Sequence, residues 1–66
     1  MKNRLKELRA KKGMTQEQLS KKAGISRPAL TQIENGKTAP DGNTIAALVK
    51  ALETPANEIF FDFNVV

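Results

Sequence analysis

The sequence predicts an all-α domain of five short helices followed by a short C-terminal β-strand. Apolar residues recur at intervals of three and four positions in several short segments, which is the spacing of one helical face. Gly13, Gly24 and Gly36 separate the first segments, and glycine commonly follows the end of a helix. Thr15 and Ser26 begin two of them, and hydroxyl side chains at such positions cap free N–H groups. The last residues alternate apolar and polar side chains, which is the period of a strand.

The first helix is expected over residues 3–12. Leu5 and Leu8 are three positions apart and lie on one face, while basic side chains fill most of the remaining surface. Gly13 is expected to end this helix, and Met14 resembles an apolar staple placed just before the next helix.

The second helix is expected to start after Thr15. A threonine followed three residues later by Gln18 makes a capping box, in which each residue's side chain bonds the other's backbone N–H. The helix continues to about Lys22, and its inner face carries Leu19 and Ala23, which are four positions apart.

The third helix is expected to begin after Ser26 and to end near Glu34 or Asn35. Pro28 fits its first turn, where the missing N–H has no helical partner. Gly24 is expected to adopt positive φ in the short connection from the second helix. Two helices joined by so few residues cross steeply, which is the helix-turn-helix arrangement.

The stretch "GKTAPDGN" is expected to be a loop, because it is rich in turn-forming residues. A fourth helix follows from about Asn43 or Thr44 to Leu52. It carries the clearest apolar stripe in the sequence, at Ile45, Leu48, Val49 and Leu52.

A short fifth helix is expected over residues 55–60, capped by Thr54-Pro55 and with Ile59 and Phe60 turned inward. In the tail "FFDFNVV" the alternation predicts a strand, and a lone strand is not stable in water. We expect it either to pair with the same strand of a second chain, which we favour, or to pack on its own core. The residues predicted to form the contact between subunits, in a dimerisation segment of about 55–66, are Ile59, Phe60, Phe61, Phe63 and Val65.

Length and composition exclude several functions. A chain of 66 residues is expected to form one domain, residues 1–66, and domains this small often need a partner subunit. The chain has no cysteine and no histidine, so we predict no disulfide, no metal site, no cofactor and no enzymatic activity. It has no apolar run long enough to span a membrane, and its charged N-terminus is not a signal peptide. The absence of cysteine fits a cytoplasmic protein.

The charge is unevenly distributed along the chain. Residues 1–38 hold ten of the eleven lysines and arginines against three glutamates, whereas residues 39–66 hold one lysine against four acids. This asymmetry predicts a polyanion partner on one side of the molecule, although a solvated basic surface explains it equally well.

The third helix has two unlike faces. Ala29, Leu30 and Ile33 share one arc of about 100°, which is expected to pack on the domain. The opposite side is expected to be free and carries Arg27, Pro28, Thr31, Gln32 and Asn35. An α-helix fits the major groove of DNA, where arginine pairs with guanine, glutamine with adenine, and a threonine methyl with the thymine methyl. We therefore predict base contacts by Arg27, Pro28, Thr31 and Gln32.

Other side chains are placed to contact phosphates. Gln16 and Ser26 stand at helix starts, where free N–H groups and the helix dipole attract anions. Asn35, Lys37 and Thr38 follow the third helix and are predicted to hold the backbone farther along. Glu34 is acidic, so we expect an internal hydrogen bond or ion pair for it.

The stretch "MTQEQLSKKAGISRPALTQIENGKTAP" resembles the phage repressor and Cro type of helix-turn-helix regulator, the XRE family. The resemblance extends over nearly the whole chain, with the motif at residues 15–35 and hallmarks at Gln16, Leu19, Ala23, Gly24, Ile25, Leu30, Ile33 and the residues 34–37. It implies a phosphate contact by Gln16, base contacts by the early Arg27 and Pro28 and the later Thr31 and Gln32 of the third helix, and main-chain phosphate contacts around Asn35 to Lys37. Two residues depart from the family pattern. Ser20 stands where alanine is frequent, and its small size should preserve the helix crossing; Pro28 stands where relatives often carry a polar base reader.

The sequence therefore predicts a homodimeric repressor that binds a palindromic operator in double-stranded DNA. A different hypothesis is an antitoxin-like or restriction-controller-like module whose main ligand is a protein, and a protein co-regulator stays open as a further partner. Sequence-independent DNA binding is a third alternative.

Overall fold

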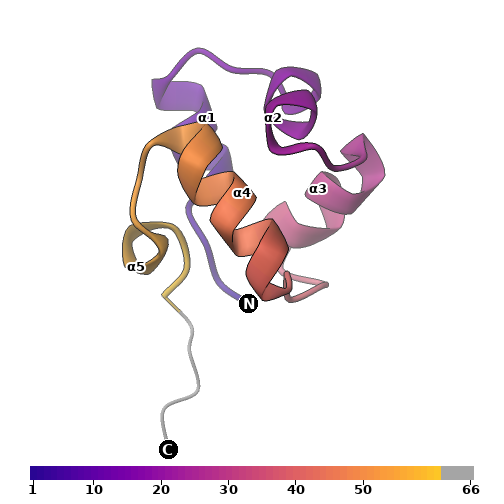
Figure 1. Ribbon diagram of the computed structural model, residues 1–66, viewed down its shortest axis with the longest axis vertical. Coiled ribbons are helices and arrows are strands. Elements are labelled where there is room, and N and C mark those ends of the chain that lie inside the picture. Colours follow the sequence, from indigo (N-terminus) through magenta and orange to yellow (C-terminus); the bar gives the residue numbers. More distant parts are fainter. Residues whose placement is uncertain (62–66) are drawn as a thin grey trace, which may run out of the picture.

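The computed structural model describes residues 1–61, which form five helices: α1 (Leu5–Lys11), α2 (Gln16–Ala23), α3 (Arg27–Glu34), α4 (Gly42–Leu52) and α5 (Ala56–Ile59). α4 lies in the middle of the view in Figure 1, with α2 and α3 on one side of it and α5 on the other. α2 packs against both α3 and α4, and α4 packs against α5. The predicted five-helix, all-α class is confirmed.

Every helix contributes apolar side chains to one core. Among the described residues the buried apolar set is Leu5, Leu19, Leu30, Ile33, Leu48, Ala51, Leu52, Ile59 and Phe60. In the predicted stripe of α4, Leu48 and Leu52 are completely buried, while Ile45 and Val49 are partly buried at its edge. The core therefore ties α3 to the rest of the molecule through Leu30 and Ile33.

α4 begins earlier than expected because a side chain caps it. Asp41 is the N-cap, and its carboxylate accepts a hydrogen bond of 2.8 Å from the N–H of Thr44. The helix therefore starts at Gly42 rather than at Asn43 or Thr44. A carboxylate cap directly after Pro40 was present in the sequence, but the glycine that follows it favoured a loop.

α1 and α5 are shorter than expected. Asn3 lies outside α1, and its side-chain oxygen accepts a hydrogen bond of 3.1 Å from the N–H of Leu5. α5 has Pro55 as its N-cap and no side-chain cap. The hydroxyl of Thr54 donates instead to the carbonyl of Leu52, at 2.9 Å.

The chain just after α5 pairs with the segment before α1. Asn3 and Phe60 form an antiparallel β-bridge, the N–H of Arg4 donates to the carbonyl of Ile59 at 2.8 Å, and that of Phe61 donates to Lys2 at 3.3 Å. The first residues of the predicted strand thus pair within their own chain, against the favoured pairing with a second chain. Phe63 and Val65 lie outside the described residues.

None of the helices described is both long enough and apolar enough to cross a membrane. Within the same residues no cluster of three or more potential metal-ligating side chains occurs.

Candidate nucleic-acid interface

The start of α2 is fixed by the predicted capping box. The hydroxyl of Thr15 accepts a hydrogen bond of 3.1 Å from the N–H of Gln18, and the Gln18 side chain accepts one of 2.8 Å from the N–H of Thr15. A first helical turn has no internal partners for its N–H groups, and the cap leaves those of Gln16 and Glu17 without one. The helix start therefore offers a local positive potential to an anion.

A left-handed glycine makes the turn between α2 and α3. Gly24 has φ of 71°, and the N–H of the next residue, Ile25, donates to the carbonyl of Ser20 at 2.9 Å. Ser20 is almost completely buried, and its hydroxyl donates to the carbonyl of Glu17 at 2.9 Å. A small side chain with a satisfied hydroxyl fits between the two helices, so the predicted crossing is preserved.

α3 presents one polar face to solvent. Ser26 caps it, accepting a hydrogen bond of 3.2 Å from the N–H of Ala29, while Leu30 and Ile33 are buried. The predicted contact residues Arg27, Pro28, Gln32 and Asn35 are exposed, and Thr31 is partly buried. The assignment of Ala29 to the packed face was wrong, because its side chain is exposed on the same side as Pro28 and Gln32.

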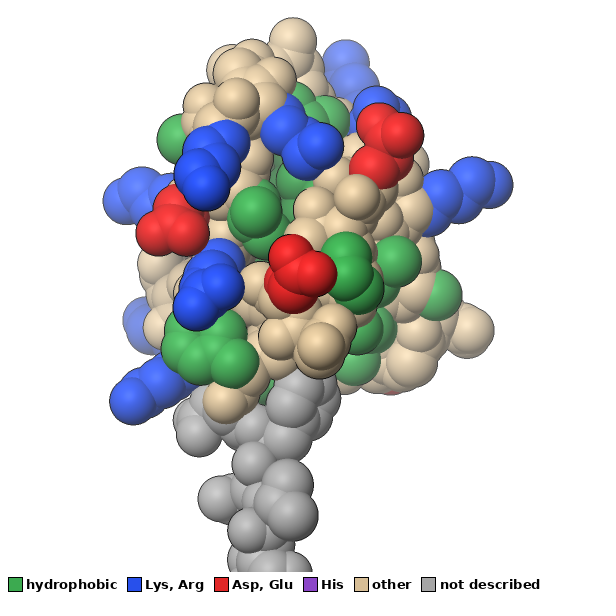
Figure 2. Space-filling model, turned by 90° about the vertical axis from the view of Figure 1, so that its left-hand side faces the viewer, with side chains coloured by type: hydrophobic (Ala, Val, Ile, Leu, Met, Phe, Trp, Pro, Cys, Tyr) green, Lys and Arg blue, Asp and Glu red, His purple; other side chains and the backbone are tan. Residues whose placement is uncertain are grey.

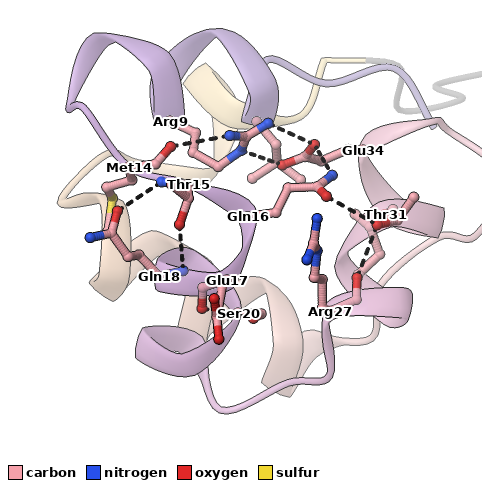
Figure 3. Close-up of polar contacts among 12 residues, drawn as sticks. Arg9, Met14, Thr15, Gln16, Glu17, Gln18, Ser20, Arg27, Thr31 and Glu34 are labelled. Carbon is pink, nitrogen blue, oxygen red and sulfur yellow. Dashed lines mark hydrogen bonds and ion pairs between the residues drawn. The ribbon is translucent and has the colours of Figure 1, made fainter.

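A polar network joins α1, α2 and α3 beside this face (Figure 3). Arg9 donates to both carboxylate oxygens of Glu34, at 2.9 and 3.3 Å, and to the carbonyl of Met14 at 3.1 Å. Gln16 donates to Glu34 at 3.0 Å and accepts a hydrogen bond of 3.5 Å from the hydroxyl of Thr31. The internal role expected for Glu34 is thereby confirmed, and its cationic partner proves to be Arg9.

The predicted phosphate residue Gln16 is therefore held inside the motif by both ends of its amide. An amide nitrogen has two N–H groups, and one of them is used by Glu34. The second N–H of the Gln16 amide stays available for a phosphate, as do the free backbone N–H groups of the first turn of α2. The side chain of Arg27 lies beside this network, between Thr31 and the start of α2 (Figure 3). None of the ion pairs among the described residues includes Arg27.

The segment after α3 uses its backbone donors internally. The N–H groups of Asn35, Gly36 and Lys37 donate to carbonyls of α3 at 3.0 Å each, and that of Thr38 at 3.4 Å. The side chains of Asn35, Lys37 and Thr38 are exposed. The main-chain phosphate contacts implied by the family resemblance are therefore less available here than side-chain contacts.

The structure places the residues predicted for the subunit contact in different surroundings. Ile59 and Phe60 are completely buried inside the protomer, so they have no surface to offer a second chain. Phe61 is 48% exposed, and the guanidinium of Arg4 lies 5.0 Å from the centre of its ring. Within the described part of the chain, Phe61 is thus the member of the predicted set that remains accessible.

The N-cap of α4 introduces one negative charge near the end of α3. The backbone N–H and the hydroxyl of Thr44 hydrogen-bond the carboxylate of Asp41 and hold its pKa below the ordinary value of 3.8. Asp41 is therefore ionised at neutral pH, and it makes this edge of the α3 surface unfavourable for a phosphate.

Sequence reasoning did not identify Arg9 or Asn3 as supports of the interface. The side-chain amide of Asn3 donates to the carbonyl of Ile33 at 2.8 Å and so holds the end of α3. A signal for Arg9 was present, because it lies four positions after the buried Leu5, on the packed side of α1. No local pattern indicates the role of Asn3, whose partner is 30 residues away.

Comparisons with known proteins agree with this geometry. A family model described as helix-turn-helix matches residues 5–59. An HTH-type transcriptional regulator of Methanocaldococcus jannaschii is 40% identical over 60 residues, which are 91% of each chain. One of Archaeoglobus fulgidus is 35% identical over 60 residues, covering 91% of this chain and 86% of the relative. The crystal structure of the restriction-modification controller protein C.AhdI from Aeromonas hydrophila superposes with a TM-score of 0.81 at 35% identity, covering 86% of each chain.

Proposed function

The chain belongs to the XRE-type helix-turn-helix family, and we propose that it is a single-domain transcription regulator that binds a specific sequence in double-stranded DNA. On this proposal the protein acts in the cytoplasm by binding DNA, and it needs no cofactor. The relatives described as HTH-type transcriptional regulators support the regulatory role. The observation that carries the proposal is the division of α3 into a face held by the core and a face left to solvent.

α3 is suited to a major groove because its buried residues and its exposed polar residues lie on opposite sides of the helix. Leu30 and Ile33 fix the helix to the core, and Glu34 fixes its end through Arg9. The exposed side carries Arg27 and Gln32, which have the donor geometry for guanine and adenine edges respectively. A helix fixed in this way presents its base-reading groups with little loss of conformational freedom on binding.

We assign base contacts to Arg27, Pro28, Thr31 and Gln32. The hydroxyl of Thr31 already donates to the carbonyl of Arg27, at 3.0 Å, so its methyl group is the part left for a base. Pro28 can offer only an apolar contact. Phosphate contacts are assigned to the residues around the two helix starts and after α3, namely Gln16, Ser26, Asn35, Lys37 and Thr38.

We further propose that two copies form a homodimer on the side of α5. α5 and α3 lie on opposite sides of α4 (Figure 1), so a contact at α5 leaves α3 free for DNA. Figure 2 faces the α5 side and displays hydrophobic side chains between basic and acidic ones, a mixed surface that suits a protein partner. Phe61 is the exposed aromatic residue on which this contact would centre, since Ile59 and Phe60 are buried.

Two-fold symmetry would then impose a palindromic operator, with half-sites about 34 Å or one helical turn apart. Repression by obstruction of RNA polymerase is the simpler mode of action for so small a protein. Selection of bound duplexes from a random pool tests the proposal directly. A palindromic consensus supports it, whereas equal recovery of unrelated sequences contradicts sequence-specific binding.

Two further measurements separate the parts of the proposal. Light scattering at micromolar concentration is expected to give the mass of a dimer, and a monomer would favour a module that depends on another protein. A promoter–reporter assay with the selected operator is expected to show lower transcription when the protein is present; higher transcription would contradict repression.

The likeness to C.AhdI favours a second, more specific candidate, namely control of restriction and modification genes. It keeps the same DNA-binding mechanism and differs in the regulated promoter. Binding of the selected operator sequence upstream of such genes, measured with promoter fragments, would distinguish this role from regulation of another gene.

A further inference from the structure

Ala29 is an apolar residue on the exposed side of α3, where polar residues would be expected. It lies in the first turn of the helix beside Pro28, and Gln32 follows three positions later on the same side. The core is already closed by Leu30 and Ile33, which are 0% and 5% exposed. Ala29 therefore contributes little to packing, and it lines the same hollow as Gln32, a proposed base reader.

The surface beside Ala29 is hollowed, and the lining of the hollow contains no basic residue. Ala29 and Gln32 line a hollow of about 420 Å³ between α3 and the start of α4, together with Thr38, Ala39 and Pro40 from the connecting segment. The one charged residue lining this hollow, among those described, is Asp41. Ala29 offers only a methyl group, so the group from DNA that meets Ala29 should be apolar and come from a base.

From this arrangement we propose that Ala29 is a specificity-determining residue that contacts the C5-methyl group of a thymine beside the base read by Gln32. The inference rests on the proposed binding of a DNA major groove by α3. Among the base edges exposed in that groove, the thymine methyl is the apolar group, and alanine side chains contact it well. The alanine methyl and the stem of Gln32, which line the same hollow, favour a methyl group beside them.

The test removes one methyl group from each side of the contact. The probe is the duplex consensus selected with the unmodified protein, synthesised with each thymine in turn replaced by deoxyuridine. This replacement removes the C5-methyl and leaves the hydrogen-bonding edge unchanged. We expect one thymine in each half-site to lose about fourfold in affinity, the equivalent of one buried methyl group.

That thymine is expected within about two base pairs of the pair whose preference relaxes in Gln32→Ala, because the two side chains are neighbours on one helix face. In Ala29→Gly the thymine and deoxyuridine duplexes should bind equally well at that position. Ala46→Gly is the matched control: Ala46 is also exposed within a helix, but in α4, and the methyl dependence should persist there.

Each outcome bears on a different claim. If no thymine methyl affects binding, or if the effect persists unchanged in Ala29→Gly, the role of Ala29 is wrong while sequence-specific binding stands. If the unmodified protein selects no consensus, the proposed function itself fails. Should Ala29→Gly not fold by circular dichroism, Ala29→Ser replaces it, and the deoxyuridine scan with the unmodified protein still decides whether a methyl group is read.

Discussion

Arg9 and Glu34 join α1 to the end of α3 through a two-point ion pair across 25 positions of the sequence. The Nε–Oε2 distance is 2.9 Å, and the side chains are 14% and 3% exposed. The same carboxylate receives the amide of Gln16. One glutamate thus fixes the position of α3 and the orientation of a residue at the start of α2.

Removing the charge of Glu34 should destabilise the fold strongly. Glu34→Gln leaves the guanidinium of Arg9 mostly buried without its counter-charge, and we expect a loss of about 3 kcal/mol in the free energy of unfolding. Urea denaturation followed by circular dichroism measures it. Glu17→Gln is the matched control, because Glu17 pairs with Lys21 at 3.6 Å on an exposed surface and its loss should amount to about 0.5 kcal/mol or less. Similar midpoints for the two variants would show that the buried pair has no special weight.

Gln32→Ala should change sequence preference. The glutamine is exposed on the face of α3 assigned to bases, so its loss is expected to weaken binding of the selected operator by about 1–3 kcal/mol and to relax preference at one base pair. Fluorescence anisotropy with single-substitution operators gives both quantities. Unaltered affinity for the operator would mean that residues 27–32 do not read bases.

Lys37→Ala should affect all sequences alike. Lys37 is exposed just after α3 and is assigned to phosphate, so its removal should weaken specific and random duplexes to the same extent. The slope of log affinity against log salt concentration should fall by about one. A selective loss on the operator would instead place Lys37 at a base.

The turn between α2 and α3 should depend on glycine. Gly24 has φ of 71° with open space around it, so Gly24→Ala meets backbone strain alone, and we expect a loss of about 1 kcal/mol in stability. Gly42→Ala makes the same change within α4, also in open space, where no positive φ occurs; there we expect a gain of about 0.5 kcal/mol. Thermal unfolding of the two variants compares their changes in stability. Equal changes would exclude backbone strain as the cause of the loss in Gly24→Ala.

The cap of α4 should respond to acid. The pKa of Asp41 is lowered in the folded state, so its contribution to stability is present above its ordinary pKa of 3.8 and is lost as the pH falls through the folded value. Asp41→Asn keeps a capping oxygen but cannot titrate. The stability advantage of the parent over Asp41→Asn should therefore shrink as the pH falls below 3.8 and through the lowered pKa of the folded state. A constant difference over that range would show that the charge of Asp41 does not contribute to capping.

Local signals predicted the helices well because the determinants are short-range. The capping box at Thr15 and Gln18, the cap at Ser26 and the left-handed Gly24 each depend on residues within a few positions. The apolar faces of α2 and α4 follow from helical spacing, and so does the burial of Leu30 and Ile33.

The remaining features depend on contacts between distant residues, which a single sequence does not reveal. The wheel of α3 put Ala29 beside Ile33, but two anchoring side chains suffice to hold the helix, so Ala29 stays exposed. Phe60 was expected to turn inward at the end of the fifth helix, and it is buried, but its backbone also forms a bridge to Asn3, at the other end of the chain. The assignment of residues of this protein to contacts with DNA remains a prediction, supported by the exposure of most of their side chains and by membership of the helix-turn-helix family.

The amide of Asn3 has a mechanical consequence. Its nitrogen holds the carbonyl of Ile33, while its backbone forms the bridge to Phe60. The chain at residues 59–61 is therefore linked to the end of α3 by this side chain as well as through the core that Ile59 and Phe60 share with Leu30 and Ile33. A partner bound at that edge of the molecule would therefore contact the same segment that holds the end of α3.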